Sequence, residues 1–111
     1  MTAPVSQVLS EAADLLEKPG AWTQGVFARN AKGENTGLSE IRGKAVCWCV
    51  LGATAASAGS NLGLSSAADH FLRDFLGVEE LGSWNDAPDR SQEEVVDALR
   101  RAAALAKDQG R

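Results

Sequence analysis

The residues of this chain that could carry out chemistry are two cysteines, one histidine and two polar side chains next to a tryptophan. Cys47 and Cys49 lie two positions apart, and His70 is the only histidine. A catalytic cysteine needs a base to form its thiolate, and histidine commonly supplies it. One hypothesis is a small hydrolase or transferase that uses Cys49 with Asn85 and Asp86. The residue types also permit a catalytic set of Cys47 or Cys49 with His70 and Asp86. The spacing does not require either arrangement, and a buried, inert cysteine is the commoner case.

The same residues do not predict a metal centre or a disulfide. Zinc ligands usually come in pairs about two to four residues apart, and one histidine with two cysteines does not match that pattern. We expect no metal and no cofactor. On a helix, the side chains of Cys47 and Cys49 point in nearly opposite directions and cannot form a disulfide. Reduced thiols fit a reducing compartment, so we expect a cytoplasmic protein.

The strongest functional candidate is the polar loop 84–90, which reads Trp84-Asn85-Asp86-Ala87-Pro88-Asp89-Arg90. Loops held by a rigid scaffold often carry binding function. The indole offers a flat apolar surface, and Asp86 or Asp89 can hold Arg90 in a charge-assisted pair. A structural interpretation competes with this one. In it, Asn85 and Asp86 hydrogen-bond the backbone of the turn while Trp84 fills the core beneath.

A second polar and aromatic segment, Trp22-Thr23-Gln24-Gly25, has the same character. Its glutamine can hydrogen-bond backbone groups that would otherwise be buried without a partner. If this segment meets loop 84–90 near the start of the apolar segment 45–58, the two form one pocket. We therefore predict a binding site from six side chains: Trp22, Gln24, Trp84, Asn85, Asp86 and Arg90.

The element expected to position these side chains is an apolar run, Ala45-Val46-Cys47-Trp48-Cys49-Val50-Leu51-Gly52-Ala53. It has no charge in a chain that is 23% charged, so it must be buried. Its length predicts a helix that continues to Ala58, with Gly59 as the cap. We expect this helix, residues 45–58, to lie buried at the centre. Its small residues from Gly52 onward allow close approach by neighbouring elements.

The remaining patterns predict a single domain over residues 1–111, of mainly helical α+β class, with about four helices around the central one. Apolar residues follow helical spacing over 4–17, over 67–76 and from Ser91 to the end of the chain. Ser91 and Glu94 form a capping box at the last helix. Residues 25–36 predict a small β-hairpin, because a strand-like run precedes Asn30-Ala31-Lys32-Gly33, which favours a turn.

The charge distribution limits the class of partner. The net charge of −4 disfavours nucleic-acid binding, which usually needs a basic face. No apolar stretch reaches the roughly 18 residues of a membrane span. Between residues 79 and 97, the chain carries seven acids and one base, Arg90. This acidic stretch is typical of a solvated surface, and it also fits a basic protein partner.

Three motifs occur in a fixed order: Trp22-x-Gln24-Gly25, then Trp48-Cys49-x-x-Gly52-Ala53, then Trp84-Asn85-Asp86. In this combination the chain resembles a family of small uncharacterised proteins from bacteria and their phages, over roughly residues 5–105. The resemblance implies the order of the elements and a domain of unknown function. It singles out Cys49, Asn85 and Asp86 as motif positions, and Cys47 and His70 lie outside it.

These observations lead to three hypotheses about function. The first is a non-enzymatic binding or regulatory module that contacts a protein partner through the Trp84-Asn85-Asp86 loop. It comes first because the chain is small and has no motif of known chemistry. The second is the cysteine-dependent enzyme built on Cys49. The third is a phage-type inhibitor of a host defence enzyme, motivated only by the acidic stretch. A homodimer that hides an apolar helix stripe is a further expectation.

Overall fold

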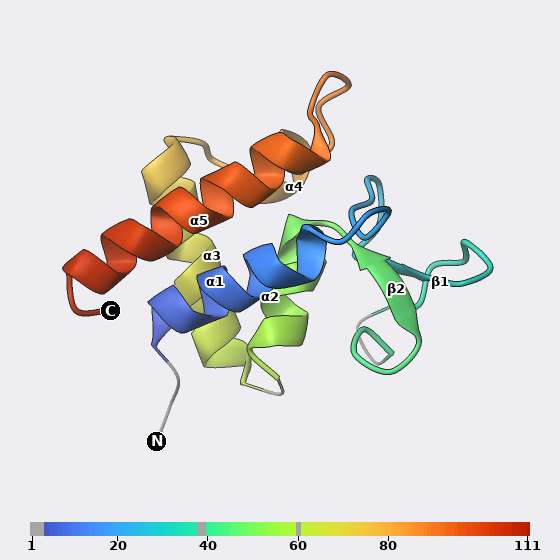
Figure 1. Ribbon diagram of the computed structural model, residues 1–111, viewed down its shortest axis with the longest axis horizontal. Coiled ribbons are helices and arrows are strands. Elements are labelled where there is room, and N and C mark those ends of the chain that lie inside the picture. Colours follow the sequence, from blue (N-terminus) through green and yellow to red (C-terminus); the bar gives the residue numbers. More distant parts are fainter. Residues whose placement is uncertain (1–3, 38–39, 60) are drawn as a thin grey trace.

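The computed structural model describes residues 4–37, 40–59 and 61–111, which form five helices and one two-stranded antiparallel sheet (Figure 1). The predicted class, mainly helical α+β, is confirmed. In chain order the elements are α1 (Val5–Leu16), β1 (Ala28–Asn30), β2 (Ala45–Trp48), α2 (Val50–Ser57), α3 (Leu62–Leu76), α4 (Leu81–Asn85) and α5 (Gln92–Asp108). None of these helices is long and apolar enough to cross a membrane.

Helices α1 and α5 lie side by side and run antiparallel, with α2 and α3 packed against α1 as well (Figure 1). The backbone N–H of Ser6 donates to the carbonyl of Arg111 at one end of the pair. At the other end, Gln92 Nε2 donates to the carbonyl of Leu16. The predicted amphipathic pattern of α1 is confirmed, because its apolar stripe is fully buried: Val8, Leu9, Ala12, Ala13 and Leu16.

The prediction of one helix over residues 45–58 is wrong in its first half. Residues Ala45–Trp48 form strand β2, and helix α2 begins only at Val50. The strand pairs with β1 in the register Ala28↔Trp48, and Trp48 also bridges Trp22 on its other side. A short apolar run satisfies a buried strand as well as a buried helix, so the pairing with distant segments decided between them. The second half is helical, as expected, but only its residues Val50, Gly52, Ala53 and Thr54 are buried, so it is less enclosed than predicted.

The predicted hairpin over 25–36 is only partly present. Strand β1 lies inside this range, but its ladder partner is β2. The returning segment makes a tight turn, in which the Asn30 N–H donates to the Glu34 carbonyl, and it adds one isolated bridge between Arg29 and Asn35. The predicted turn at residues 30–33 is confirmed, and the local pattern does not contain the longer-range partner β2.

Two helix boundaries differ from the prediction. Helix α3 begins at Leu62, before the expected residue 67, because the Asn61 side chain caps it by accepting from the Leu64 N–H. Trp84 and Asn85 belong to the short helix α4 and not to a loop, which starts only at Asp86. The predicted capping box at the start of α5 is confirmed.

Candidate functional site

The two polar segments meet at the start of α2, and Asn85 joins them. Its side chain is fully buried. Asn85 Oδ1 accepts from Trp22 Nε1 at 2.8 Å and from the Val50 N–H at 3.0 Å. Asn85 Nδ2 donates to the Thr23 carbonyl at 3.1 Å and to Asp86 Oδ1 at 3.0 Å. These four contacts use the hydrogen-bonding capacity of the amide, so Asn85 is a structural link with nothing left for a ligand.

Gln24, in segment 22–25, hydrogen-bonds the C-terminal end of α4. Its Nε2 donates to the carbonyls of Asn85 and Ala87, both at 2.9 Å. The last carbonyls of a helix have no partner within the helix, and this amide supplies one. Trp22 and Gln24 therefore hold segment 22–25 against α4 and α2.

Asp86 is the member of the predicted set that reaches solvent as a charged group. It is exposed, and its Oδ1 accepts both from Asn85 Nδ2 and from the Gly25 N–H, each at 3.0 Å. Gly25 has φ +86°, a conformation that favours glycine. In this conformation its N–H donates to the Asp86 carboxylate. In the described part of the chain, no residue donates to Asp86 Oδ2. The carboxylate is thus held in place with one oxygen free.

An open pocket of about 310 Å³ lies beside this carboxylate. Its apolar side chains include Phe27, which is 41% exposed, together with Val26 and Leu51. The pocket is lined by eight residues: Gly25, Val26, Phe27, Asn35, Cys49, Leu51, Gly82 and Asp86. Of the residues predicted from sequence, only Cys49 and Asp86 line it. We call this hollow the Asp86 pocket.

Gly52 determines how the Asp86 pocket is built. A Cβ atom on this residue would lie 2.0 Å from the Phe27 carbonyl oxygen, so only glycine allows this approach to α2. The same carbonyl accepts from the Cys49 N–H at 3.0 Å. Phe27 is therefore fixed by its backbone at the start of α2, while its ring remains exposed. The sequence predicted close approach at Gly52 but gave no signal that Phe27 would be the neighbour.

Cys49 is a capping residue with little nucleophilic character. Its side chain is only 5% exposed, and Sγ accepts from the Gly52 N–H at 3.4 Å. Burial raises the pKa of the thiol, the backbone N–H groups of Gly52 and Leu51 lower it in part, and the nearby Asp86 carboxylate raises it further. A raised pKa leaves the thiol protonated near neutral pH, whereas a nucleophile needs the thiolate.

The histidine does not complete a cysteine-based site. His70 is exposed on α3, and its Nδ1 lies 2.6 Å from an Arg73 guanidinium nitrogen. Arginine only donates, so Nδ1 is the acceptor in this contact. No hydrogen bond in the described ranges links His70 to Cys49. Within the same ranges, no three metal-ligating side chains of the His, Cys, Asp and Glu types cluster around one point.

The helical argument against a disulfide does not hold, because Cys47 lies on strand β2 and Cys49 follows the end of that strand. Alternate residues of a strand share one face, so the two thiols do not point in opposite directions as a helix would require. Both are nevertheless free thiols, Cys47 half-buried and Cys49 buried.

Trp84 and Arg90 form a separate unit outside the Asp86 pocket. The Arg90 guanidinium lies 4.4 Å from the centroid of the Trp84 ring, and its Nε donates to the Trp84 carbonyl at 2.9 Å. Its ionic partner is Glu94, at 3.0 Å, and not Asp86 or Asp89 as predicted. Glu94 lies four positions after Arg90, in the first turn of α5, within reach of the guanidinium. The arginine covers one face of the indole.

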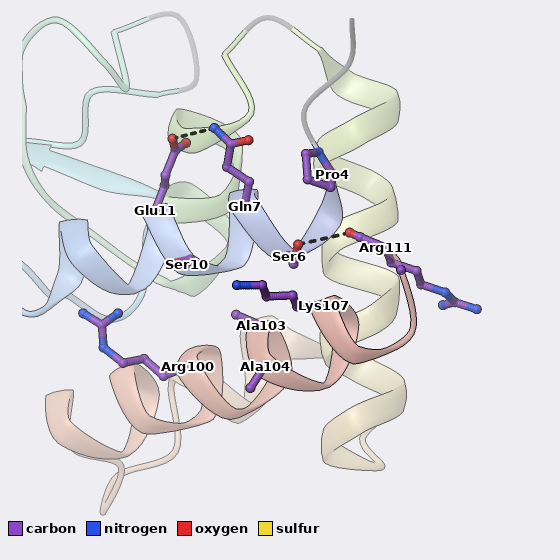
Figure 2. A pocket seen from close by; sticks show the side chains of 11 residues that line it. Pro4, Ser6, Gln7, Ser10, Glu11, Arg100, Ala103, Ala104, Lys107 and Arg111 are labelled. Carbon is purple, nitrogen blue, oxygen red and sulfur yellow. Dashed lines mark hydrogen bonds between the residues drawn. The ribbon is translucent and has the colours of Figure 1, made fainter.

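A larger pocket of about 690 Å³ lies between α1 and the C-terminal half of α5 (Figure 2). Short side chains such as Ser6, Ser10 and Ala103 form much of its lining, and Lys107 crosses it. Arg100 at its edge is already paired with Asp14 and Glu17. None of the residues predicted from sequence lines this pocket, so the Asp86 pocket remains the candidate site.

Comparison with known proteins assigns the chain to a family without assigning an activity. No curated protein and no solved structure matches the chain. Residues 1–105, nearly the whole sequence, match one family described as a family of unknown function. The chain therefore belongs to the family of unknown function DUF6197.

Proposed function

We propose that this protein is a non-enzymatic binding module that contacts a protein partner through the surface around the Asp86 pocket. The observation that carries this proposal is an exposed aromatic ring, Phe27, beside a fixed and exposed carboxylate, Asp86. Such a pairing of apolar area with a placed polar group is typical of recognition sites. The predicted Trp84-Asn85-Asp86 segment contributes through Asp86, while Trp84 and Asn85 serve the scaffold.

The rigidity of the surface supports binding. Asp86 Oδ1 is held by two N–H groups, and the segment that carries Gly25 is tied to Asn85 through Thr23. A surface that is already ordered loses little conformational entropy when it binds. The volume of about 310 Å³ lies at the lower end of ligand pockets, which span about 300–1,000 Å³. It suits one side chain of a larger partner.

The cysteine-dependent enzyme is less well supported, because burial raises the pKa of the Cys49 thiol and its sulfur already caps α2. Alkylation tests this comparison directly. In the folded protein we expect iodoacetamide to modify the half-buried Cys47 and to leave Cys49 unmodified until the protein is unfolded. Mass spectrometry of the digested protein distinguishes the two sites. Preferential alkylation of Cys49 in the folded state would favour the enzyme instead.

Two free thiols also support the proposed cytoplasmic location.

A site-specific photocrosslinker tests the binding module. We would place benzoylphenylalanine at position 27, and at position 46 as the matched control, since Val46 is also exposed, at 50%. In a lysate of the source organism, we expect a discrete adduct from position 27 and none from position 46. The proposal fails if position 27 yields no adduct, or if both positions yield the same adducts.

A further inference from the structure

We propose that the Asp86 pocket takes a lysine side chain of the partner protein, with the ammonium on Asp86 Oδ2 and the carbon chain against Phe27. This inference rests on the proposed binding function and names the chemistry that the site selects. The occupant is a primary ammonium at the end of a flexible apolar chain, presented by a surface segment of another protein.

The hydrogen bonds of Asp86 distinguish an ammonium from a guanidinium. Oδ1 already accepts from the Gly25 N–H and from Asn85 Nδ2, each at 3.0 Å, so only Oδ2 is open to a ligand. Arginine gains most from a carboxylate when its planar fork reaches both oxygens. Lysine behaves as a compact point charge and needs one oxygen only. The geometry therefore favours lysine.

The walls of the pocket match the stem of a lysine. Phe27, Val26 and Leu51 are apolar, and the Phe27 ring is 41% exposed. Lysine buries its methylene chain along apolar surface while its head remains with a polar group. A cation within about 6 Å of an aromatic ring gains a further attraction from the ring. The pocket of about 310 Å³ has room for one such side chain.

The neighbouring charges leave the pocket favourable to a cation. Glu80 lies next to it, since a Cβ atom on the lining residue Gly82 would be 3.4 Å from Glu80 Oε1. Arg29 lies on the Gly25 side, where an added Cβ would be 4.0 Å from its Nη2. Its hydrogen bonds go to the neutral groups Thr23, Gln24 and Gly33, so it keeps its positive charge, and the two carboxylates Asp86 and Glu80 outweigh it. The charge of Asp86 also reaches the interior of the pocket, because it raises the pKa of the Cys49 thiol.

Amide-resolved NMR with small probes tests the proposal. We would titrate the ¹⁵N-labelled protein with Nα-acetyl-lysine amide, Nα-acetyl-arginine amide and Nα-acetyl-norleucine amide, up to about 50 mM, where even millimolar contacts saturate. We expect the lysine probe to shift the amide signals of residues that line the pocket, including Gly25, Phe27 and Leu51. The norleucine probe has the same stem length without the charge and should shift them little.

Two variants test whether the negative charge that binds lysine is that of Asp86. Asp86→Asn keeps the shape of the side chain and its acceptor oxygen, and we expect it to weaken lysine binding by at least about tenfold. Asp89→Asn removes an exposed acid three positions further along the chain and should change the affinity by less than about twofold. Retained dispersion of the amide signals shows that each variant is folded. If Asp86→Asn does not fold, Phe27→Ala serves instead, with an expected loss of several-fold.

Each of the other outcomes overturns the lysine proposal. Equal shifts with norleucine would show an apolar pocket without charge selectivity, and tighter binding of the arginine probe would show a guanidinium site. No shift with any probe would exclude the anchor. The photocrosslink from position 27 separates the two proposals. If it still forms in the Asp86→Asn protein, the binding module stands and the lysine anchor fails. If it never forms, the binding module itself fails.

Discussion

Asn85 shows how one side chain can serve the scaffold while a neighbour serves the surface. It is buried, and four hydrogen bonds connect it to segment 22–25, to α2 and to Asp86. We predict that Asn85→Ala destabilises the fold by about 3 kcal/mol, because the Trp22 indole N–H and the Val50 N–H lose their acceptor inside the protein. Urea denaturation followed by tryptophan fluorescence measures the change.

Asn61→Ala is the matched control for that experiment. Asn61 is exposed and caps α3 with a single hydrogen bond, so its loss should cost about 1 kcal/mol. Equal effects for the two variants would show that Asn85 is not the link we describe. The sequence allowed both interpretations of Asn85, as a ligand-binding amide or as a turn residue. The tertiary structure decides for the structural role, because the Trp22 indole N–H and the Val50 N–H both donate to Asn85 Oδ1.

At the scale of elements, Gly52 determines how closely the chain before β1 approaches α2. An added Cβ would lie 2.0 Å from the Phe27 carbonyl, which is backbone and cannot simply move away. We predict that Gly52→Ala destabilises the protein by about 2 kcal/mol, although alanine gains about 1 kcal/mol over glycine in a helix. Thermal denaturation should show a clear fall in Tm.

Gly82→Ala is the control, because Gly82 is also helical and its added Cβ meets only side-chain ends, Glu80 Oε1 at 3.4 Å and Leu51 Cδ1 at 3.8 Å. We expect this variant to be neutral or stabilised by up to about 1 kcal/mol. A Gly52→Ala protein as stable as Gly82→Ala would refute the close approach of Phe27 to α2.

The contact between α2 and α3 contains a titratable group. Thr54 is fully buried, and its Oγ1 lies 3.0 Å from the Leu51 carbonyl and 2.5 Å from Asp69 Oδ1. The Thr54 hydroxyl has one proton, which it shares between these two acceptors. Burial raises the pKa of Asp69 from its ordinary 3.8 to about 6, against smaller opposing effects of Thr54 and Arg73.

The pH dependence of stability follows from this shift. Between about pH 4 and pH 6, the folded protein binds more protons at Asp69 than the unfolded chain does, so rising pH destabilises the fold. The contribution of Asp69 is complete below about pH 4 and lost above about pH 6. We predict that Asp69→Asn removes this loss, so that its stability relative to the wild type improves by roughly 2 kcal/mol from pH 4 to pH 7.

Chemical denaturation at several pH values measures that difference. Asp74→Asn, an exposed aspartate on the same helix, should track the wild type across the range. A constant difference between the wild type and Asp69→Asn from pH 4 to pH 7 would contradict the raised pKa and the proton-sharing contact with Thr54.

At the scale of the whole molecule, α1 is the element around which the helices assemble. It packs against α5, α2 and α3, and five of its side chains are fully buried, among them Val8, Leu9 and Leu16. The contact with α5 joins the two ends of the described chain, because Ser6 bonds Arg111. An element enclosed in this way opens only when most of the core opens.

Amide hydrogen exchange tests this hierarchy. We predict that the amides of α1 and the middle of α5 exchange only through global unfolding, with protection equal to the full stability of the protein. The turn 30–35 should exchange through local opening, because most of its residues are exposed. Similar protection in the turn and in α1 would show that the helical pair is not the stable centre of the fold.

The sequence predicted the features that depend on neighbouring residues. The spacing of Val8, Leu9 and Leu16 specified α1, and Ser91 with Glu94 specified the start of α5, because helical periodicity and capping act within a few positions. These interactions are local, so a single sequence without coordinates is sufficient to identify them.

The tertiary structure decided everything that depends on distant partners. Strand β2 exists because Ala28 and Trp22 flank Trp48, and an apolar run by itself does not distinguish a strand from a helix. The choice of Asp86, and not Trp84 or Asn85, as the exposed group follows from which side chains the segment 22–25 engages. Phe27 lines the Asp86 pocket because of another long-range contact: its carbonyl accepts from the Cys49 N–H at the start of α2. Such pairings depend on how segments far apart in sequence pack together, and local residue patterns do not encode that packing directly.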